Sequence, residues 1–143
     1  MPQVVVYQQD NGIAAILNPT SEALESMTIE EIAAKDVPAG VAWEIIDSSE
    51  LPADRTFRDA WTKGSGTVTE DLDKSKEIAH SRRRAKREVE FKPYDDIIMK
   101  QIPGADTTAA EASRAAIRTK YETMQNSIDS ATSTAEIKTA LDV

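Results

Sequence analysis

The stretch TIEEIAAKDVPAGVAWEIIDSSELPADRTFRDAW, residues 28–61, carries most of the signals that decide how the first half of this chain folds. Thr28 followed by Glu31 forms a capping box, in which the two side chains satisfy backbone N–H groups at the start of a helix. This helix is predicted to run to about Lys35. Pro38 ends it, because the residue before a proline is disfavoured in the α region.

The same stretch continues as a predicted strand and a polar loop. Residues 41–46 alternate between two faces, which predicts a strand with one face buried. Trp43 is expected at the centre of the small core, because a chain with few aromatic side chains depends on each of them for packing. Trp61, at the end of the loop, has two possible roles: it either joins this core or lines a binding surface.

Two pairs of short segments predict β-hairpins on either side of this stretch. Residues 4–7 and 13–17 are apolar runs, and Asn11-Gly12 between them is a strong hairpin signal, since both residues tolerate positive φ. Residues 56–62 and 67–69 flank a turn with two glycines and form the second candidate hairpin. We therefore expect a small antiparallel sheet with one short helix packed on it.

Charge divides the chain into two unequal halves. The net charge is −8, and residues 1–70 hold 12 acidic against 4 basic side chains, whereas residues 71–143 hold 13 of each. An acidic front half is poorly suited to nucleic acid, because phosphate contacts need Lys and Arg. Strand signals also give way to helix signals near Thr69. The sequence therefore predicts an α+β chain with an acidic β-rich head, residues 1–68, and a helical C-terminal region, residues 69–143.

The second half is predicted as a coiled-coil-like helical hairpin with a terminal hook. Pro93 is expected to break the first helix, because proline removes a backbone hydrogen bond and clashes with the preceding turn. Pro103-Gly104 is expected to end the next segment. The predicted helices cover about residues 70–92, 94–102, 108–130 and 134–141.

The third of these helices carries an apolar seam at near-heptad spacing. A two-helix hairpin with so little leucine is marginal in water, so we expect a partner to cover the seam. The predicted partner-binding residues are Ile117, Tyr121, Met124 and Ile128, with Trp61 of the head as a further candidate.

One basic cluster interrupts the otherwise balanced charges of the helical half. It consists of Arg82, Arg83, Arg84, Lys86 and Arg87. Two interpretations stay open: a solvated helix balanced by nearby glutamates, or a contact with an acidic surface such as the front half of a neighbouring copy. Nucleic-acid binding is disfavoured, because no aromatic side chain lies among these residues to stack on bases.

Residues with catalytic or metal-binding chemistry are sparse. The chain has no cysteine, and His80 is its only histidine, so neither thiolate sites nor histidine pairs are available. The paired carboxylates stand near predicted helix starts, where they complement the helix dipole. We therefore predict no enzyme activity, no cofactor and no metal site.

The segment over residues 28–61 resembles small structural proteins of tailed bacteriophages, which are usually encoded beside tail-fibre or baseplate genes. The shared pattern comprises T-I-E-E-I-A at a helix start, a V-P-A-G-V turn, an E-I-I-D strand and D-R-T-F-R-D-A-W at the end. Asp59 stands where such proteins commonly carry asparagine. The helical remainder of the chain is similar to them only loosely.

This resemblance implies a non-enzymatic virion protein of the tail, associated with fibre or baseplate proteins as partners and mediating fibre attachment or assembly. The alternatives are a fibre-assembly chaperone that is not retained in the virion, and a nucleic-acid-binding regulator. Because fibres are commonly trimeric, a homotrimer is compatible with the seam. The N-terminus lacks the features of a signal peptide, and no apolar run approaches membrane-spanning length. We expect synthesis in the host cytoplasm, location in the virion tail and no membrane contact.

Overall fold

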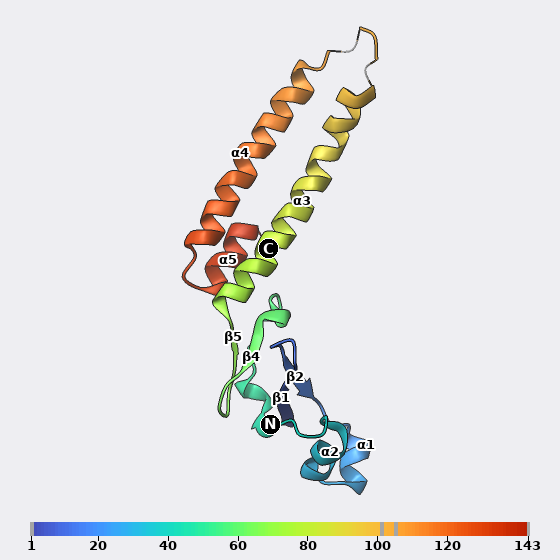
Figure 1. Ribbon diagram of the computed structural model, residues 1–143, viewed down its shortest axis with the longest axis vertical. Helices are drawn as coiled ribbons and strands as arrows, with labels where there is room; N and C mark the ends of the chain where they lie inside the picture. Colours follow the sequence, from blue (N-terminus) through green and yellow to red (C-terminus); the bar gives the residue numbers. More distant parts are fainter. Residues whose placement is uncertain (1, 101, 105, 143) are drawn as a thin grey trace. The chain divides into compact units, whose positions relative to one another are not determined.

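A computed structural model describes residues 2–100, 102–104 and 106–142 of the chain (Figure 1). Its contacts divide the chain into two compact units: unit 1, Met1–Lys74, and unit 2, Ser75–Val143. Unit 1 holds a small antiparallel sheet and unit 2 holds long helices, so the predicted α+β class is confirmed. The division between the units falls after Lys74, just inside the helix that begins at Leu72, whereas we predicted it after residue 68.

The main sheet of unit 1 has three antiparallel strands in the order β2-β1-β3. β1 spans Gln3–Gln8, β2 spans Ala14–Leu17 and β3 spans Trp43–Asp47. The turn between β1 and β2 contains Gly12 at φ +81°, a left-handed conformation that glycine adopts at little cost. The predicted N-terminal hairpin is therefore confirmed.

The central strand β1 is buried on both faces, which explains why its valines follow one another without alternation. One face packs on a second hairpin formed by β4, Trp61–Lys63, and β5, Val68–Glu70. The apolar cluster on this face contains Val4, Val6, Ala14, Ile46, Trp61 and Val68. The other face packs through Val5 on Ala33 and Val37. The second predicted hairpin is thus also found, with a shorter first strand than expected.

Two short helices, and not one, accompany this sheet. α1 spans Ser21–Ser26 and α2 spans Ile29–Asp36. The capping box predicted for α2 is present with both of its hydrogen bonds. We missed α1, whose N-cap is Thr20: its hydroxyl accepts a hydrogen bond from the backbone N–H of Ala23 at 3.1 Å. Two 3-10 turns complete the unit, η1 at Ser48–Glu50 and η2 at Arg58–Ala60.

Trp61, and not Trp43, is the central aromatic side chain of unit 1. Trp61 is 0% exposed, whereas Trp43 lies opposite Tyr7 at the end of the β1–β3 pairing and stays partly exposed. The guanidinium carbons of Arg55 and Arg58 lie 5.4 and 4.5 Å from the Trp61 ring centroid, within cation–π range. Our prediction for Trp43 was wrong. The alternation of apolar residues shows which face of a strand is buried, but it does not show which part of the strand another layer of the protein covers.

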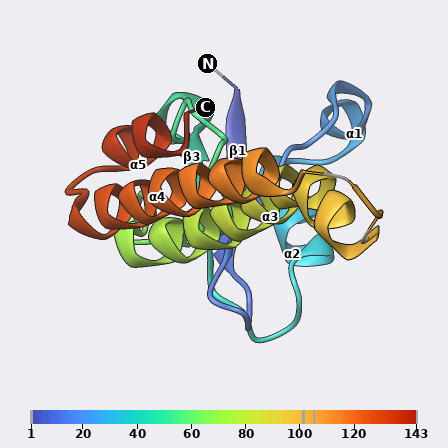
Figure 2. The same cartoon turned by 90° about the horizontal axis from the view of Figure 1, so that it is seen from above.

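Unit 2 is helical and holds most of α3 together with α4 and α5 (Figures 1 and 2). α3 spans Leu72–Lys100 and so begins within unit 1, α4 spans Thr108–Ser130, and α5 spans Thr134–Leu141. In both views α3 and α4 lie side by side and α5 folds back along α4. Ser133 caps α5 by accepting a hydrogen bond from the backbone N–H of Glu136 at 3.2 Å. The terminal hook is thus a capped helix.

Pro93 does not break α3, contrary to our prediction of two helices over residues 70–92 and 94–102. Proline has no N–H to donate to the carbonyl of Val89, one turn earlier. Both residues are exposed, so water can hydrate that carbonyl. The lost hydrogen bond therefore leaves no unsatisfied group in the interior, and the helix continues to Lys100.

The core of unit 2 comes mainly from α4 and α5. Their buried apolar residues are Ala110, Ile117, Tyr121, Met124, Ile128, Ala131, Ile137 and Leu141. The buried residues of α3 are Ser75, Ala79 and Arg83, of which only one is apolar. Ala85 and Val89 of this helix are exposed.

We predict that Ile128→Ala lowers the free energy of unfolding of unit 2 by about 2–5 kcal/mol, because the isoleucine side chain is 0% exposed and its loss leaves a cavity. Urea denaturation followed by helical circular dichroism measures this. Val89→Ala, on a side chain that is 73% exposed, is the control and should change the value by less than about 1 kcal/mol. Equal effects of the two substitutions would contradict the assignment of the core.

Candidate functional site

The seam predicted to bind a partner lies inside unit 2. Ile117, Tyr121, Met124 and Ile128 are all buried, as is Trp61 within unit 1. The hook supplies the apolar side chains that we had expected a partner to provide, since Ile137 and Leu141 of α5 are buried as well. We therefore correct the prediction for these five residues: they are core residues of the folded chain, and the surface that meets a partner must be sought elsewhere.

The surface between α3 and α4 is largely charged. Two ion pairs and one hydrogen bond join the helices: Asp95 pairs with Arg114 at 2.9 Å, Glu90 pairs with Lys120 at 2.7 Å, and the His80 imidazole lies 2.7 Å from the Asp129 carboxylate. Lys76 also donates from Nζ to the backbone carbonyl of Asp129 at 3.0 Å. As the residue number rises on α3 it falls on α4, so these contacts set the antiparallel register of the two helices.

Glu90 is the most highly connected carboxylate in this surface. The hydrogen bond from Lys120, joined by one from the Tyr121 hydroxyl, lowers the pKa of Glu90 below its ordinary value of 4.5. The same contact raises the pKa of Lys120. Burial, and then Glu90, raise the pKa of Tyr121. All three groups therefore keep one arrangement at neutral pH: a carboxylate that accepts from an ammonium and from a phenol.

The basic cluster does not form one surface in the structure. Lys86 donates from Nζ to the carbonyl of Leu141 at 2.9 Å, and Arg84 donates to the Ser81 hydroxyl at 3.4 Å. Arg82 is exposed. Arg83 is only 7% exposed, and the guanidinium of Arg87 lies 5.2 Å from the ring centroid of Phe91. The cluster is therefore divided between a helix-end contact, a solvated side, and two residues that face the same hollow, the buried Arg83 and the exposed Arg87.

Arg83 and Arg87 line a hollow between α3 and α4, which we call the arginine hollow. Its volume is about 200 Å³, and its lining residues are Arg83, Arg87, Arg118, Tyr121, Glu122 and Gln125. Burial, together with repulsion from Arg84 and Arg87, lowers the pKa of Arg83, although Asp129 partly opposes the shift. We missed Arg118 because it lies far from the basic cluster in sequence. The antiparallel pairing of the two predicted helices is the signal that would have placed it near Arg87.

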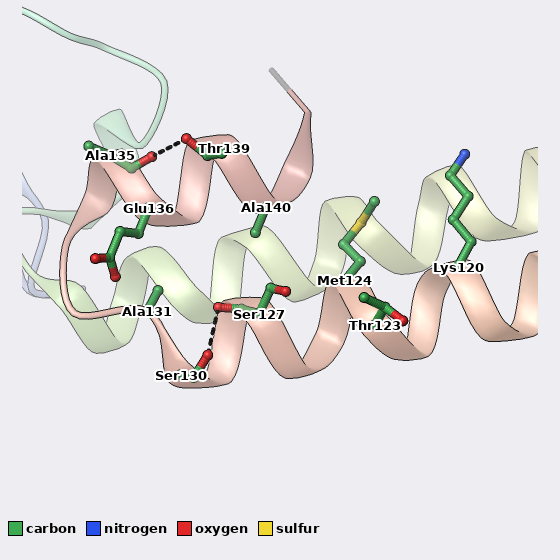
Figure 3. A pocket seen from close by; sticks show the side chains of 10 residues that line it. All are labelled: Lys120, Thr123, Met124, Ser127, Ser130, Ala131, Ala135, Glu136, Thr139 and Ala140. Atoms are coloured by element: carbon green, nitrogen blue, oxygen red, sulfur yellow. Dashed lines mark hydrogen bonds between the residues drawn. The ribbon is translucent and has the colours of Figure 1, made fainter.

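A larger groove of about 630 Å³ runs between α4 and α5 (Figure 3). Small side chains line most of it, among them Thr123, Ser127, Ala135 and Ala140. Glu136 lies at its edge but is already engaged, since it accepts hydrogen bonds from the backbone N–H and hydroxyl of Thr132. Small residues allow the two helices to approach while leaving this space unfilled.

Exposed large apolar side chains gather at the C-terminal end of α3. Within the described part of the chain, five large hydrophobic residues are exposed, and four of them follow one another closely: Val89, Ile97, Met99 and Ile102. Leu24 in α1 is the fifth. Val89 and Ile97 lie eight residues apart with Pro93 between them, so the three share one face of the helix.

Neither a metal-binding cluster nor a membrane-spanning helix is present in residues 2–100, 102–104 and 106–142. In these ranges, no three His, Asp or Glu side chains gather where they would hold a metal ion. None of the described helices combines the length and the apolar character that crossing a bilayer requires. His80 instead has a structural role: Arg83 donates from Nε to its Nδ1 at 3.3 Å, so the imidazole proton lies on Nε2, toward Asp129.

Comparisons with protein-family models, with curated proteins and with solved structures find no match to this chain.

We predict that Glu90→Gln makes the stability of unit 2 depend less on pH in the acidic range. A carboxylate with a lowered pKa contributes stability that is present above its ordinary pKa of 4.5 and is lost as the pH falls through the lowered value. The pair is partly exposed, so its contribution is about 1 kcal/mol or less. Thermal unfolding between pH 7 and pH 3 should show a variant that is less stable at pH 7 and converges with the unmodified chain in acid. Glu88→Gln, on an exposed glutamate of the same helix, is the control and should keep the full slope.

Proposed function

We propose that this chain is a non-enzymatic structural protein of a bacteriophage tail, associated with the tail fibre or baseplate, and that it mediates attachment or assembly of the fibre. The proposal begins from the resemblance of residues 28–61 to small phage tail proteins. It assigns the chain a role in protein–protein contact and places it in the assembled virion.

The observation that carries the proposal is that the residues of the resemblance act together in unit 1. Thr28 and Glu31 close the capping box of α2. Asp54 accepts hydrogen bonds from the backbone N–H and the hydroxyl of Thr56, which fixes the loop before Trp61. Arg58 then covers the buried Trp61 ring. The resemblance therefore follows the interactions that build one folded module, which supports a shared fold with those tail proteins.

A second observation supports a role in protein–protein contact. Contiguous exposed apolar surface on a soluble chain commonly marks a binding site for another protein. Val89, Ile97, Met99 and Ile102 are exposed large apolar side chains that lie close together in sequence on and just beyond α3. We propose that this end of α3, in place of the buried seam of α4, meets another tail protein.

Mass spectrometry of purified virions from a phage that encodes this chain tests the assignment. Presence in a fixed ratio to the fibre or baseplate proteins is the expected result. Presence during infection but loss from finished particles would replace the structural role by that of an assembly chaperone. Salt-dependent binding to duplex DNA, together with absence from virions, would replace both by a nucleic-acid-binding role.

We predict that the double substitution Val89→Glu and Met99→Glu lowers incorporation into virions by about tenfold or more, which corresponds to about 1.4 kcal/mol of lost binding free energy. Both side chains are more than two-thirds exposed, with Met99 at 77%, so the fold should persist. Leu24→Glu in α1, at 49% exposure, is the matched control and should leave incorporation unchanged. Quantitative mass spectrometry of particles gives the readout. Unchanged incorporation of the double variant would show that the contact lies elsewhere.

A further inference from the structure

We propose that the arginine hollow is a binding site for one oxyanion, a phosphate-, sulfate- or carboxylate-sized group held by Arg83, Arg87 and Arg118. This site is independent of the role in the phage tail, and neither proposal requires the other. It rests on three features of the hollow: convergent positive charge, the absence of a carboxylate to neutralise it, and the burial of one of its guanidinium groups.

The first feature is convergence from two helices. Arg83 and Arg87 lie one turn apart on α3, and Arg118 approaches from α4, so all three line the same space of about 200 Å³. The ring of Phe91 lies beneath the guanidinium of Arg87 at 5.2 Å and orients it. Gln125, also in the lining, provides an amide N–H₂ donor. A compact anion in this space would meet hydrogen-bond donors on several sides.

The second feature is the lack of a neutralising partner. Within the described part of the chain, no carboxylate lies within 4.0 Å of the guanidinium groups of Arg83, Arg87 or Arg118. The nearby carboxylates are engaged elsewhere, Glu90 by Lys120 and Tyr121 and Asp129 by His80.

Glu122 is the one carboxylate that lines the hollow, and it forms no such ion pair. Three positive charges and one negative charge therefore face the hollow, which leaves a net charge of about +2 for a ligand to neutralise.

The third feature is the burial of Arg83. Its side chain is 7% exposed, and Nε donates to Nδ1 of His80, so one donor of the guanidinium is committed. A guanidinium carries five N–H groups and stays charged inside proteins, which makes burial costly unless an anion compensates it. Arg83 therefore lies where an oxyanion would relieve both its desolvation and the repulsion from its arginine neighbours.

The chemistry of the lining favours a compact oxyanion over nucleic acid. Arginine binds carboxylate and phosphate oxygens in a bidentate manner because its N–H groups match their spacing. The one aromatic ring in the lining, Tyr121, is buried and donates its hydroxyl to Glu90, so it offers no free face for a base. The anion has two possible sources, a free inorganic ion or an acidic side chain of another polypeptide.

Calorimetric titration of the full chain distinguishes these sources. One arm uses sodium phosphate, a second uses an acetylated triglutamate peptide, and sodium chloride at matched ionic strength is the blank. The expected result is saturable one-site binding in at least one of the first two arms. Arginine Nε–Hε resonances provide a direct readout, and the signal of Arg83 should shift on binding.

Arg118→Gln is the decisive variant, because Arg118 is exposed and its removal leaves the core intact. It should weaken binding about tenfold or more, whereas Arg84→Gln should bind as the unmodified chain does, since Arg84 contacts the Ser81 hydroxyl and does not line the hollow. Phosphate binding with this pattern identifies a free-anion site, and binding of the peptide alone identifies an acidic polypeptide.

Three results would overturn the proposal. The first is the absence of binding in both ligand arms at millimolar concentration. The second is equal weakening by Arg84→Gln and Arg118→Gln, which would indicate unspecific attraction to a basic helix. The third is preferential, salt-dependent binding of duplex DNA that both variants reduce alike. The virion assay is unaffected by any of these results, so failure of one proposal is distinguishable from failure of the other.

Discussion

The structure of unit 2 depends on the way α3 is held to α4 by charged side chains, with little apolar contact from α3 itself. Of the buried residues of α3 only Ala79 is apolar, and Ile78, Phe91, Tyr94 and Ile98 are partly buried. The ion pairs of Asp95 and Glu90 and the hydrogen bond of His80 therefore contribute strongly to the register. Partly exposed ion pairs contribute little free energy each, but they discriminate strongly between registers because a shift places like charges together. The apolar stabilisation comes instead from α4 and α5, which bury Ile128, Ile137 and Leu141 against each other and their surroundings.

Local signals in the sequence were sufficient for most elements of the fold. The Asn-Gly turn and the capping box at Thr28 are short-range features, and each is found where it was expected. The prediction of a helix break at Pro93 was wrong because the free-energy cost of a proline in a helix depends on whether water can hydrate the carbonyl that loses its hydrogen bond. The local sequence does not show whether that side of the helix is exposed. The prediction that Trp43 is the central core residue was wrong for a related reason. The strand pattern did not show which tryptophan the second hairpin would pack against β1.

The candidate sites were harder to predict than the fold because they depend on contacts between distant segments. The seam of α4 was identified correctly as apolar, but its burial requires Ile137 and Leu141, which belong to a hook that we regarded as an appendage. The basic cluster was identified as a run of residues, yet its members point in different directions, and Lys86 is used to bind the carbonyl of Leu141. Arg118 joins the hollow only through the pairing of two helices. Sequence spacing describes one helix at a time, whereas a site at a helix pair requires the register between both.

The charged interface also accounts for the location of the arginine hollow. Arg114 and Lys120 of α4 form ion pairs with Asp95 and Glu90 of α3, so these two carboxylates are not available to other bases. Of the five bases at residues 82–87, Arg83 and Arg87 line the hollow, and Glu122, the one carboxylate of its lining, forms no ion pair with them within 4.0 Å. The helix pair therefore carries an excess of positive charge around the arginine hollow. Arg83 is buried there with no carboxylate of the described residues within 4.0 Å of its guanidinium. The interactions that fix the register of α3 on α4 thus create a local excess of charge, and a compact anion is the chemical species that would balance it.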